Sequence, residues 1–309
     1  MILTFAPNPA LERVALVERF VPGEAQKPMR VSTHAGGAGL RVANVVRRLG
    51  GEVLALAFVG GRVGTVLRDC LDKQDIPHVL TPTVAETRGS FLVIDKDQGV
   101  VTDIPEETAP TTPEEQEKLL TSLTRHLPNA KLLIVADDAE GKDTDLYVRA
   151  FAAAKEAEVP VIVDLRDGPL VSAIEAGVFA LRVSHKTLQQ QTETSLQHDS
   201  AILAEARSIV ERGVTNVIVT LGEEGALLIN ATGAWRVQAP VVSHFNPTGS
   251  GQALTGAFAV HYLLTGDVVE ATRYACAAAS VNVTYDEPGY ATPGEIAVLF
   301  PKTTAKSLR

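Results

Sequence analysis

Residues Phe245–Phe258 read FNPTGSGQALTGAF, a glycine-rich turn that leads directly into a helical pattern of small and apolar residues. A helix that begins behind such a turn presents unpaired N–H groups and a partial positive charge, so Gly249, Ser250 and Gly251 are predicted to form an anion hole. Phosphate chemistry would next require a carboxylate that takes the proton from an attacking hydroxyl. The sequence has Gln252 at that point, and its neutral amide cannot accept the proton.

A second glycine-rich turn lies near the N-terminus, where Gly36 and Gly37 precede a helical pattern at Leu40–Leu49. Glycines allow a ligand to approach the backbone closely, and the helix start behind them offers similar anion-binding N–H groups. The same residues would also suit a tight turn that binds nothing. Asn8 lies in the segment APNPALE at the end of a predicted strand, where doubly wound sheets bind ligands.

The segment TLGEEGA, residues 220–226, joins two predicted strands. Thr220, Gly222 and Gly225 suit a plain hairpin turn, and they equally suit the wall of a nucleotide pocket. The sequence alone leaves both interpretations open.

The other side chains that could act as bases or metal ligands show no spacing typical of a catalytic pair. The histidines of this kind are His34, His244 and His261, for which we expect structural or solvated roles. The acidic run at Asp137, Asp138 and Glu140 could bind a cation or form a solvated loop. We therefore predict no metal site built from these groups.

The composition is that of an ordinary globular protein, with 45% hydrophobic and 21% charged residues. The net charge of −9 argues against nucleic acid or a membrane as a partner, so an anionic substrate would need a local basic site. No apolar run approaches the ~20 residues that cross a bilayer. Cys70 and Cys276 lie far apart, which favours buried free thiols in a reducing compartment. We therefore expect a cytoplasmic protein.

Short apolar runs alternate with helical patterns along the chain, which is typical of a parallel sheet buried on both faces. The predicted strands are Ile2–Ala6, Val53–Val59, Leu132–Ala136, Val161–Asp164, Phe179–Val183 and Val217–Leu221. The predicted helices are Leu40–Leu49, Val63–Gln74, Pro113–His126, Asp143–Glu158 and Ser200–Arg212. These elements predict an α/β fold with a doubly wound, mostly parallel sheet flanked by helices.

Two stretches interrupt this alternation, at about residues 10–34 and 86–106, where extended patterns have no helix between them. Within the second, SFLVIDKDQGVVTDI predicts a hairpin around Asp97-Gln98-Gly99. Together the two stretches predict a small antiparallel β lid outside the main sheet. We expect residues 1–309 to form a single domain with these lid segments inserted in it.

Five motifs occur in the order and spacing of the ribokinase-like (PfkB) sugar kinase family: PNPALE, AGGAGLRVANVVRRLGG, ETRG, TLGEEGALL and NPTGSGQALTGAF. The chain resembles the branch of 1-phosphofructokinase and tagatose-6-phosphate kinase over nearly its whole length. The resemblance implies a ribokinase-like fold and a lid that often forms a homodimer. It also implies that ATP, with Mg²⁺, phosphorylates a hydroxyl of a phosphosugar such as fructose 1-phosphate or tagatose 6-phosphate.

The resemblance also implies roles for single residues. The nucleotide-binding positions are Thr220, Gly222, Gly225 and Asn282. The substrate-binding positions are Asn8, Glu12, Gly36, Gly37, Arg41 and Arg88. Arg88 matches an arginine that contacts the substrate phosphate, and Glu12 replaces the family's Asp with a side chain one methylene longer.

Several positions depart from the family pattern. The family's catalytic Asp is Gln252, and the Lys and Asn that hold substrate are Ala38 and Arg41. The Asn and Glu that place Mg²⁺ through water are Ser184 and Thr187, which makes the cofactor Mg²⁺ doubtful. These changes predict a sugar-phosphate kinase homologue that is impaired or inactive. Two hypotheses stay open: a working kinase with a substitute base, and a non-catalytic protein that binds nucleotide or sugar phosphate.

Overall fold

The computed structural model of the chain describes residues 1–137, 144–192, 196, 198–243 and 245–308. Asp138, Glu140 and His244, which were considered above as ligands or bases, lie outside the described residues.

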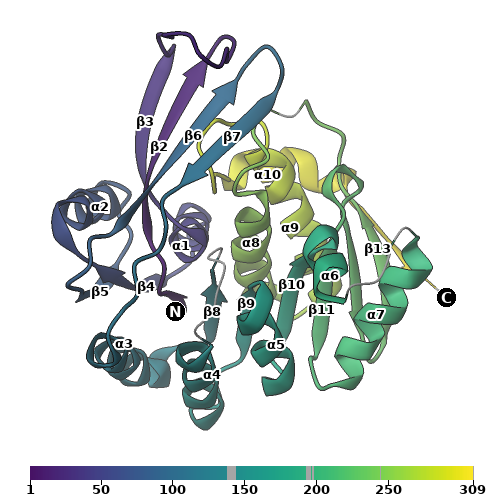
Figure 1. Cartoon of the computed structure of the whole chain (residues 1–309). Helices are drawn as coiled ribbons and strands as arrows, with labels where there is room; N and C mark the ends of the chain where they lie inside the picture. The colour runs from purple at the N-terminus through teal and green to yellow at the C-terminus, as the bar shows by residue number, and fades with distance from the viewer. Residues whose placement is uncertain (138–143, 193–195, 197, 244, 309) are drawn as a thin grey trace.

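Within the described residues, ten strands form one large sheet (Figure 1). They are β1 (Ile2–Ala6), β4 (Val53–Val59), β5 (His78–Pro82), β8 (Leu132–Ala136), β9 (Val161–Asp164), β10 (Ala180–Ser184), β11 (Asn216–Thr220), β12 (Ala226–Asn230), β13 (Gly233–Gln238) and β14 (Thr304–Leu308). Their spatial order is β14-β13-β12-β11-β10-β9-β8-β1-β4-β5. From β11 to β5 every pair is parallel, and β12, β13 and β14 extend the sheet by antiparallel pairs.

Helices cover both faces of this sheet, which explains the continuous apolar runs of its strands. One face packs against α1 (Ala38–Arg48), α2 (Gly61–Lys73), α8 (Ser250–Thr265), α9 (Val268–Asn282) and α10 (Pro293–Leu299). The other face packs against α3 (Pro113–His126), α4 (Asp145–Glu156), α5 (Asp167–Ala176), α6 (His185–Thr192) and α7 (Asp199–Glu211). Side chains alternate between the two cores along each strand, so Ile2 faces α1 and α8 whereas Leu3 faces the α3–α7 layer.

The structure confirms the predicted doubly wound α/β class, and α1, α2, α4 and α7 each begin and end within two residues of the predicted bounds. Strands β1, β4, β8 and β9 begin and end where they were predicted, and β10 and β11 are each shifted by one residue. Helix α3 has its predicted bounds and starts with a capping box, because Thr112 Oγ1 accepts from Glu115 N and Glu115 Oε2 accepts from Thr112 N. No described helix is both long and apolar enough to be a membrane span.

A second sheet of four strands among the described residues stands beyond the carboxyl ends of the main strands (Figure 1). Its strands are β2 (Ala10–Val17), β3 (Arg30–Gly36), β6 (Arg88–Asp95) and β7 (Val100–Pro105), in the order β3-β2-β6-β7. The β2–β3 and β6–β7 pairs are antiparallel, as predicted. The central β2–β6 pair is parallel, because both strands leave the same edge of the main sheet in the same direction.

The inner face of this lid packs near the turn before α8. Val14, Leu92 and Ile94 form a small buried cluster against which Phe245 packs. The lid is therefore held over the glycine-rich turn that the sequence singled out.

The two cysteines are buried free thiols, as predicted. Burial raises the pKa of the Cys276 thiol to about 12, and burial also raises the pKa of Cys70. Neither thiol is therefore activated as a nucleophile.

Candidate functional site

The turn before α8 is fixed by two buried asparagines. Asn246 Oδ1 accepts from Thr248 N at 2.9 Å, and Asn282 Nδ2 donates to Thr248 O at 2.9 Å. Gly249 has φ +82°, and a Cβ at this residue would lie 2.3 Å from the Gly289 nitrogen. Only glycine fits this position, so the local sequence determines where α8 starts.

A network of side chains connects the start of α8 with β9. The carboxylate of Asp164 ends β9, is 6% exposed, and accepts from Gln252 Nε2 at 3.1 Å. Its Oδ2 also accepts from Thr255 Oγ1 at 3.4 Å, and its Oδ1 accepts from Arg182 at 2.8 Å. Gln252 therefore uses its amide N–H to bind a buried carboxylate of the protein itself.

Arg182 lies between the start of α8 and the end of β11. It is the register partner of Asp164 in the β9–β10 pair, and its second terminal nitrogen donates to Thr220 Oγ1 at 3.2 Å. A Cβ on Gly251 would lie 2.4 Å from that same nitrogen, so the guanidinium packs directly against the first turn of α8. The Nε atom of Arg182 is buried and has no hydrogen-bond partner among the described residues.

Ser184 and Thr187 hydrogen-bond to each other at the start of α6. The hydroxyl oxygens are 2.7 Å apart, and Thr187 N donates to Ser184 Oγ at 3.0 Å. This pairing has the geometry of a helix cap, in which a serine oxygen accepts from the backbone N–H three residues later.

The turn after β11 contains two glycines with positive φ, +65° at Gly222 and +92° at Gly225. A Cβ on Gly225 would lie 2.1 Å from Val237 O, whereas one on Gly222 would meet no described atom within 4 Å. Gly225 is thus required by packing, and the position of a Gly222 Cβ is open space.

Asn282 is fully buried at the end of α9. Besides its bond to Thr248 O, its Oδ1 accepts from Gly289 N at 2.8 Å and Tyr290 N at 3.0 Å. In this structure Asn282 therefore acts as a clamp between the α8 turn and the loop at 289–290.

On the lid side, a buried ion pair covers the Gly36-Gly37 turn. Arg41 binds both carboxylate oxygens of Glu12, at 2.6 and 3.2 Å, and Gly37 N donates to Glu12 Oε1 at 2.9 Å. Glu12 is 1% and Arg41 7% exposed. A Cβ on Gly36 would lie 2.0 Å from Glu12 Cδ, so the glycine makes room for this carboxylate.

Asn8 forms a second cluster beside this ion pair. Its Oδ1 accepts from Arg88 Nε at 2.9 Å and from Thr108 Oγ1 at 2.8 Å, and its Nδ2 donates to Asp137 Oδ1 at 3.1 Å. Asp137 also accepts from the hydroxyl of Tyr147. A cavity of about 40 Å³ is lined in part by Asn8, Arg88 and Thr108.

The Asn8 cluster lies at the point at which the strand order of the sheet reverses. Asn8 follows β1 and Asp137 follows β8, and the chain proceeds outward in both directions from this pair of strands. In doubly wound sheets a ligand binds beyond the carboxyl ends of the strands at this switch point.

The sequence matches the family described as "pfkB family carbohydrate kinase" over residues 10–294. The chain belongs to the pfkB family of carbohydrate kinases. The ATP-dependent 6-phosphofructokinase isozyme 2 of Mycobacterium tuberculosis is 28% identical over 279 residues, which are 90% of this chain and 82% of that protein. The 1-phosphofructokinase of Escherichia coli strain K12 is 23% identical over 97% of this chain and 96% of that protein. The crystal structure of Escherichia coli phosphofructokinase-2 in complex with potassium has the same fold, with a TM-score of 0.89 and 21% identity over 97% of this chain and 98% of that one.

Against the pfkB pattern, the structure brings the predicted residues into three groups. The predicted substrate positions lie in the lid strands, in the loop between β1 and β2, and in and just before α1. Gln252 and the predicted anion-hole residues lie at the start of α8, and Thr220 and Gly222 lie at the end of β11. Asp164 and Thr255 were not predicted as site residues. An aspartate at the carboxyl end of a buried strand was the signal that could have identified Asp164.

Within the described residues, no group of three His, Cys, Asp or Glu side chains is arranged to hold a metal ion. The two described histidines named above have structural contacts. His34 Nε2 and Ser32 Oγ are 2.8 Å apart, and His261 stacks on Tyr274, where burial lowers the pKa of the His261 imidazole.

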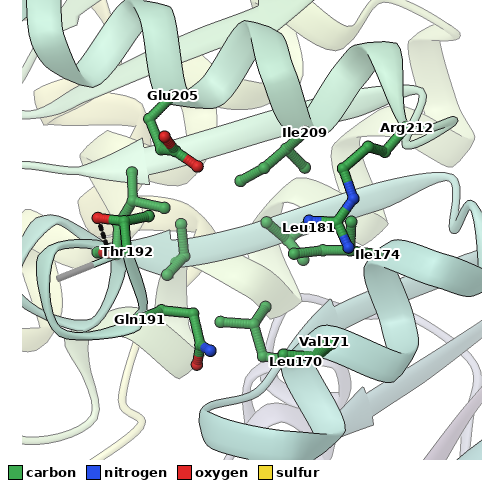
Figure 2. A pocket seen from close by; sticks show the side chains of 11 residues that line it. Leu170, Val171, Ile174, Leu181, Gln191, Thr192, Glu205, Ile209 and Arg212 are labelled. Carbon is green, nitrogen blue, oxygen red and sulfur yellow. Dashed lines mark hydrogen bonds between the residues drawn. The ribbon is translucent and has the colours of Figure 1, made fainter. Parts of the chain in front are cut away.

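Figure 2 shows a cavity of about 220 Å³ that α5, α6 and α7 enclose with β10. Leu181 and Val183 of β10 line it. Because side chains alternate along a strand, Arg182 lies on the opposite face. The cavity is therefore separate from the candidate site.

Proposed function

We propose that this pfkB-family chain binds nucleotide and phosphosugar in the family's cleft, and that its phosphoryl transfer is impaired. The single observation that carries the proposal is the hydrogen bond from Gln252 Nε2 to Asp164 Oδ2 at 3.1 Å. Gln252 stands where the family resemblance expects the general base. Its side chain has no carboxylate, and its amide cannot accept a proton from a substrate hydroxyl.

For the nucleotide, ATP is proposed to lie along Thr220, Gly222 and Gly225, with its phosphates toward Gly249–Gly251. The open space beside Gly222 and the start of α8 support this placement. Asn282 would contribute indirectly, because it holds the turn at Thr248 through its buried amide.

For the sugar phosphate, Arg88 is the proposed cation, since it lies with Asn8 and Thr108 around a small cavity. Arg41 is a weaker candidate, because its charge is already neutralised by Glu12. The Glu12 carboxylate also occupies the space over Gly36. A sugar that used the Gly36-Gly37 turn would therefore have to displace Glu12.

A second candidate function is a working sugar-phosphate kinase in which Asp164 serves as the base. This alternative is supported by the position of the Asp164 carboxylate, one hydrogen bond away from Gln252. It is weakened by the three side chains that already donate to that carboxylate. An Asp164→Asn variant tests this alternative, because turnover that survives in the folded variant would exclude Asp164 as the base.

We also propose that the lid forms a homodimer and that the protein works in the cytoplasm. Val31, Phe91 and Ile104 lie on one face of the lid. Phe91 pairs with Ile104, and Val31 pairs with Ala15 of β2, whose side chain is on the same face as Phe91. They are 45%, 44% and 56% exposed, which is unusual for large apolar side chains so close together.

Isothermal titration calorimetry of the full chain with ATP or ADP, followed by a phosphosugar, tests the binding proposal. We expect nucleotide to bind and Thr220→Val to weaken binding, with Thr232→Val, on the exposed turn after β12, as a matched control. If neither nucleotide binds at millimolar concentration, the proposed nucleotide binding is wrong and only the family's fold is supported.

A further inference from the structure

The residues that would place Mg²⁺ in a pfkB-type site do not fit that role here. Ser184 and Thr187 hydrogen-bond to each other at 2.7 Å instead of presenting a carboxylate to a metal-bound water. Both carboxylate oxygens of Asp164 accept hydrogen bonds from protein side chains. Mg²⁺ prefers carboxylate oxygens and waters in near-octahedral geometry, and these donors do not supply them.

The site also has fewer negative charges than the family pattern predicts. Positions 187 and 252 are occupied by Thr187 and Gln252, so the two carboxylates expected from the family resemblance are absent. Asp164, the carboxylate next to Gln252, is paired with Arg182 at 2.8 Å. Fewer negative groups beside the phosphates reduce the repulsion that a metal ion would otherwise have to neutralise.

Arg182 places its guanidinium at the point where the phosphates are proposed to lie, although one of its terminal nitrogens is paired with Asp164 at 2.8 Å. Its guanidinium packs against Gly251 at the start of α8, contacts Thr220 on the nucleotide side, and has a buried Nε without a partner. A guanidinium offers five N–H donors in a planar fork and binds phosphate oxygens directly.

We infer that this site binds a nucleoside triphosphate without Mg²⁺, with the Arg182 guanidinium in place of the metal beside the phosphates. This inference rests on the proposed nucleotide binding. It distinguishes this chain from an enzyme in which the metal–nucleotide complex is the bound species.

The test is calorimetric titration of the full chain with ATP, once with excess MgCl₂ and once with excess EDTA. We expect the two Kd values to agree within about threefold. Arg182→Gln should weaken binding in EDTA by about tenfold or more, whereas Arg212→Gln, at the cavity enclosed by α5, α6 and α7 (Figure 2), should not change it.

Removing Arg182 alone leaves Asp164 unpaired, so the double variant Arg182→Gln/Asp164→Asn is measured beside it, with thermal unfolding as a check of folding. Binding with MgCl₂ but not with EDTA would overturn the metal-independent inference and leave nucleotide binding intact. Binding in EDTA that survives in a folded double variant would overturn the role of Arg182. No binding in either buffer would remove the proposed function itself, and the inference with it.

Discussion

Replacing Gln252 by Asp asks whether a carboxylate at this position is enough to restore phosphoryl transfer. The change removes the hydrogen bond to Asp164 Oδ2, and hydrogen bonds to charged groups contribute about 1.5–3 kcal/mol. It also places a second negative charge beside Asp164. Two like charges about 4–6 Å apart repel by about 3–4 kcal/mol at an effective dielectric constant of about 20. Because Arg182 offsets part of this repulsion, we expect the free energy of unfolding to fall by about 2–4 kcal/mol.

The matched control is Gln252→Asn, which has the size of Asp without its charge. Urea unfolding of both variants separates the repulsion from the shorter side chain. Turnover is measured as ADP formation with fructose 1-phosphate, fructose 6-phosphate and tagatose 6-phosphate. For Gln252→Asp we expect a gain well below the roughly 100-fold that marks the low end of general-base catalysis. A variant as stable as Gln252→Asn with a hundredfold gain in turnover would refute the reasoning.

The remaining substitutions explain why one change should not suffice. Ala38, Ser184 and Thr187 leave substrate and metal placement unrepaired, and groups that act as a unit do not contribute additively. Adding Ala38→Lys, Arg41→Asn, Ser184→Asn and Thr187→Glu to Gln252→Asp should therefore give a larger gain in the same assay.

Three further predictions follow from the described contacts. Glu12→Gln leaves the Arg41 charge buried without its partner and should lower the free energy of unfolding by about 3–5 kcal/mol, and an unchanged urea midpoint would contradict this. The Cys276 thiol has its pKa raised from 9.0 to about 12, so the folded state keeps a proton that the unfolded state loses between these values. Stability should fall as pH rises through this window, with a slope of up to about 1.4 kcal/mol per pH unit that Cys276→Ala flattens, and equal slopes would argue against it. Phe91→Asp should convert a lid dimer to a monomer in light scattering, and a wild type that is monomeric throughout would exclude the lid interface.

The main sheet could be predicted because each of its central strands is a short apolar run buried on both faces. Helices α5 and α6 were not predicted. Helix α5 begins with Asp167-Gly168-Pro169, residues that usually mark a turn, although proline is tolerated in a first helical turn. Helix α6 is polar and buries only Leu188 among its described residues, so it has no apolar periodicity to detect.

The candidate site was predictable only as a set of motifs. The position of Gln252 follows from the turn before α8, because glycines at a helix start have a specific geometry. Its contact with Asp164 joins residues from β9 and α8 that lie 88 positions apart, and no local pattern encodes that distance. No local pattern encodes the pairing of Glu12 with Arg41 either. The sequence predicted Arg41 as a substrate-binding residue, and the structure shows it bound to Glu12.

The central claim is that this pfkB-family chain binds nucleotide but has lost efficient phosphoryl transfer. Its most direct test is ADP formation by the wild-type protein with ATP, Mg²⁺ and each of the three phosphosugars, under conditions where calorimetry detects bound ATP. We predict no phosphosugar-dependent ADP formation above background. Robust turnover with any one of the sugars would contradict the claim and would require a base other than Gln252.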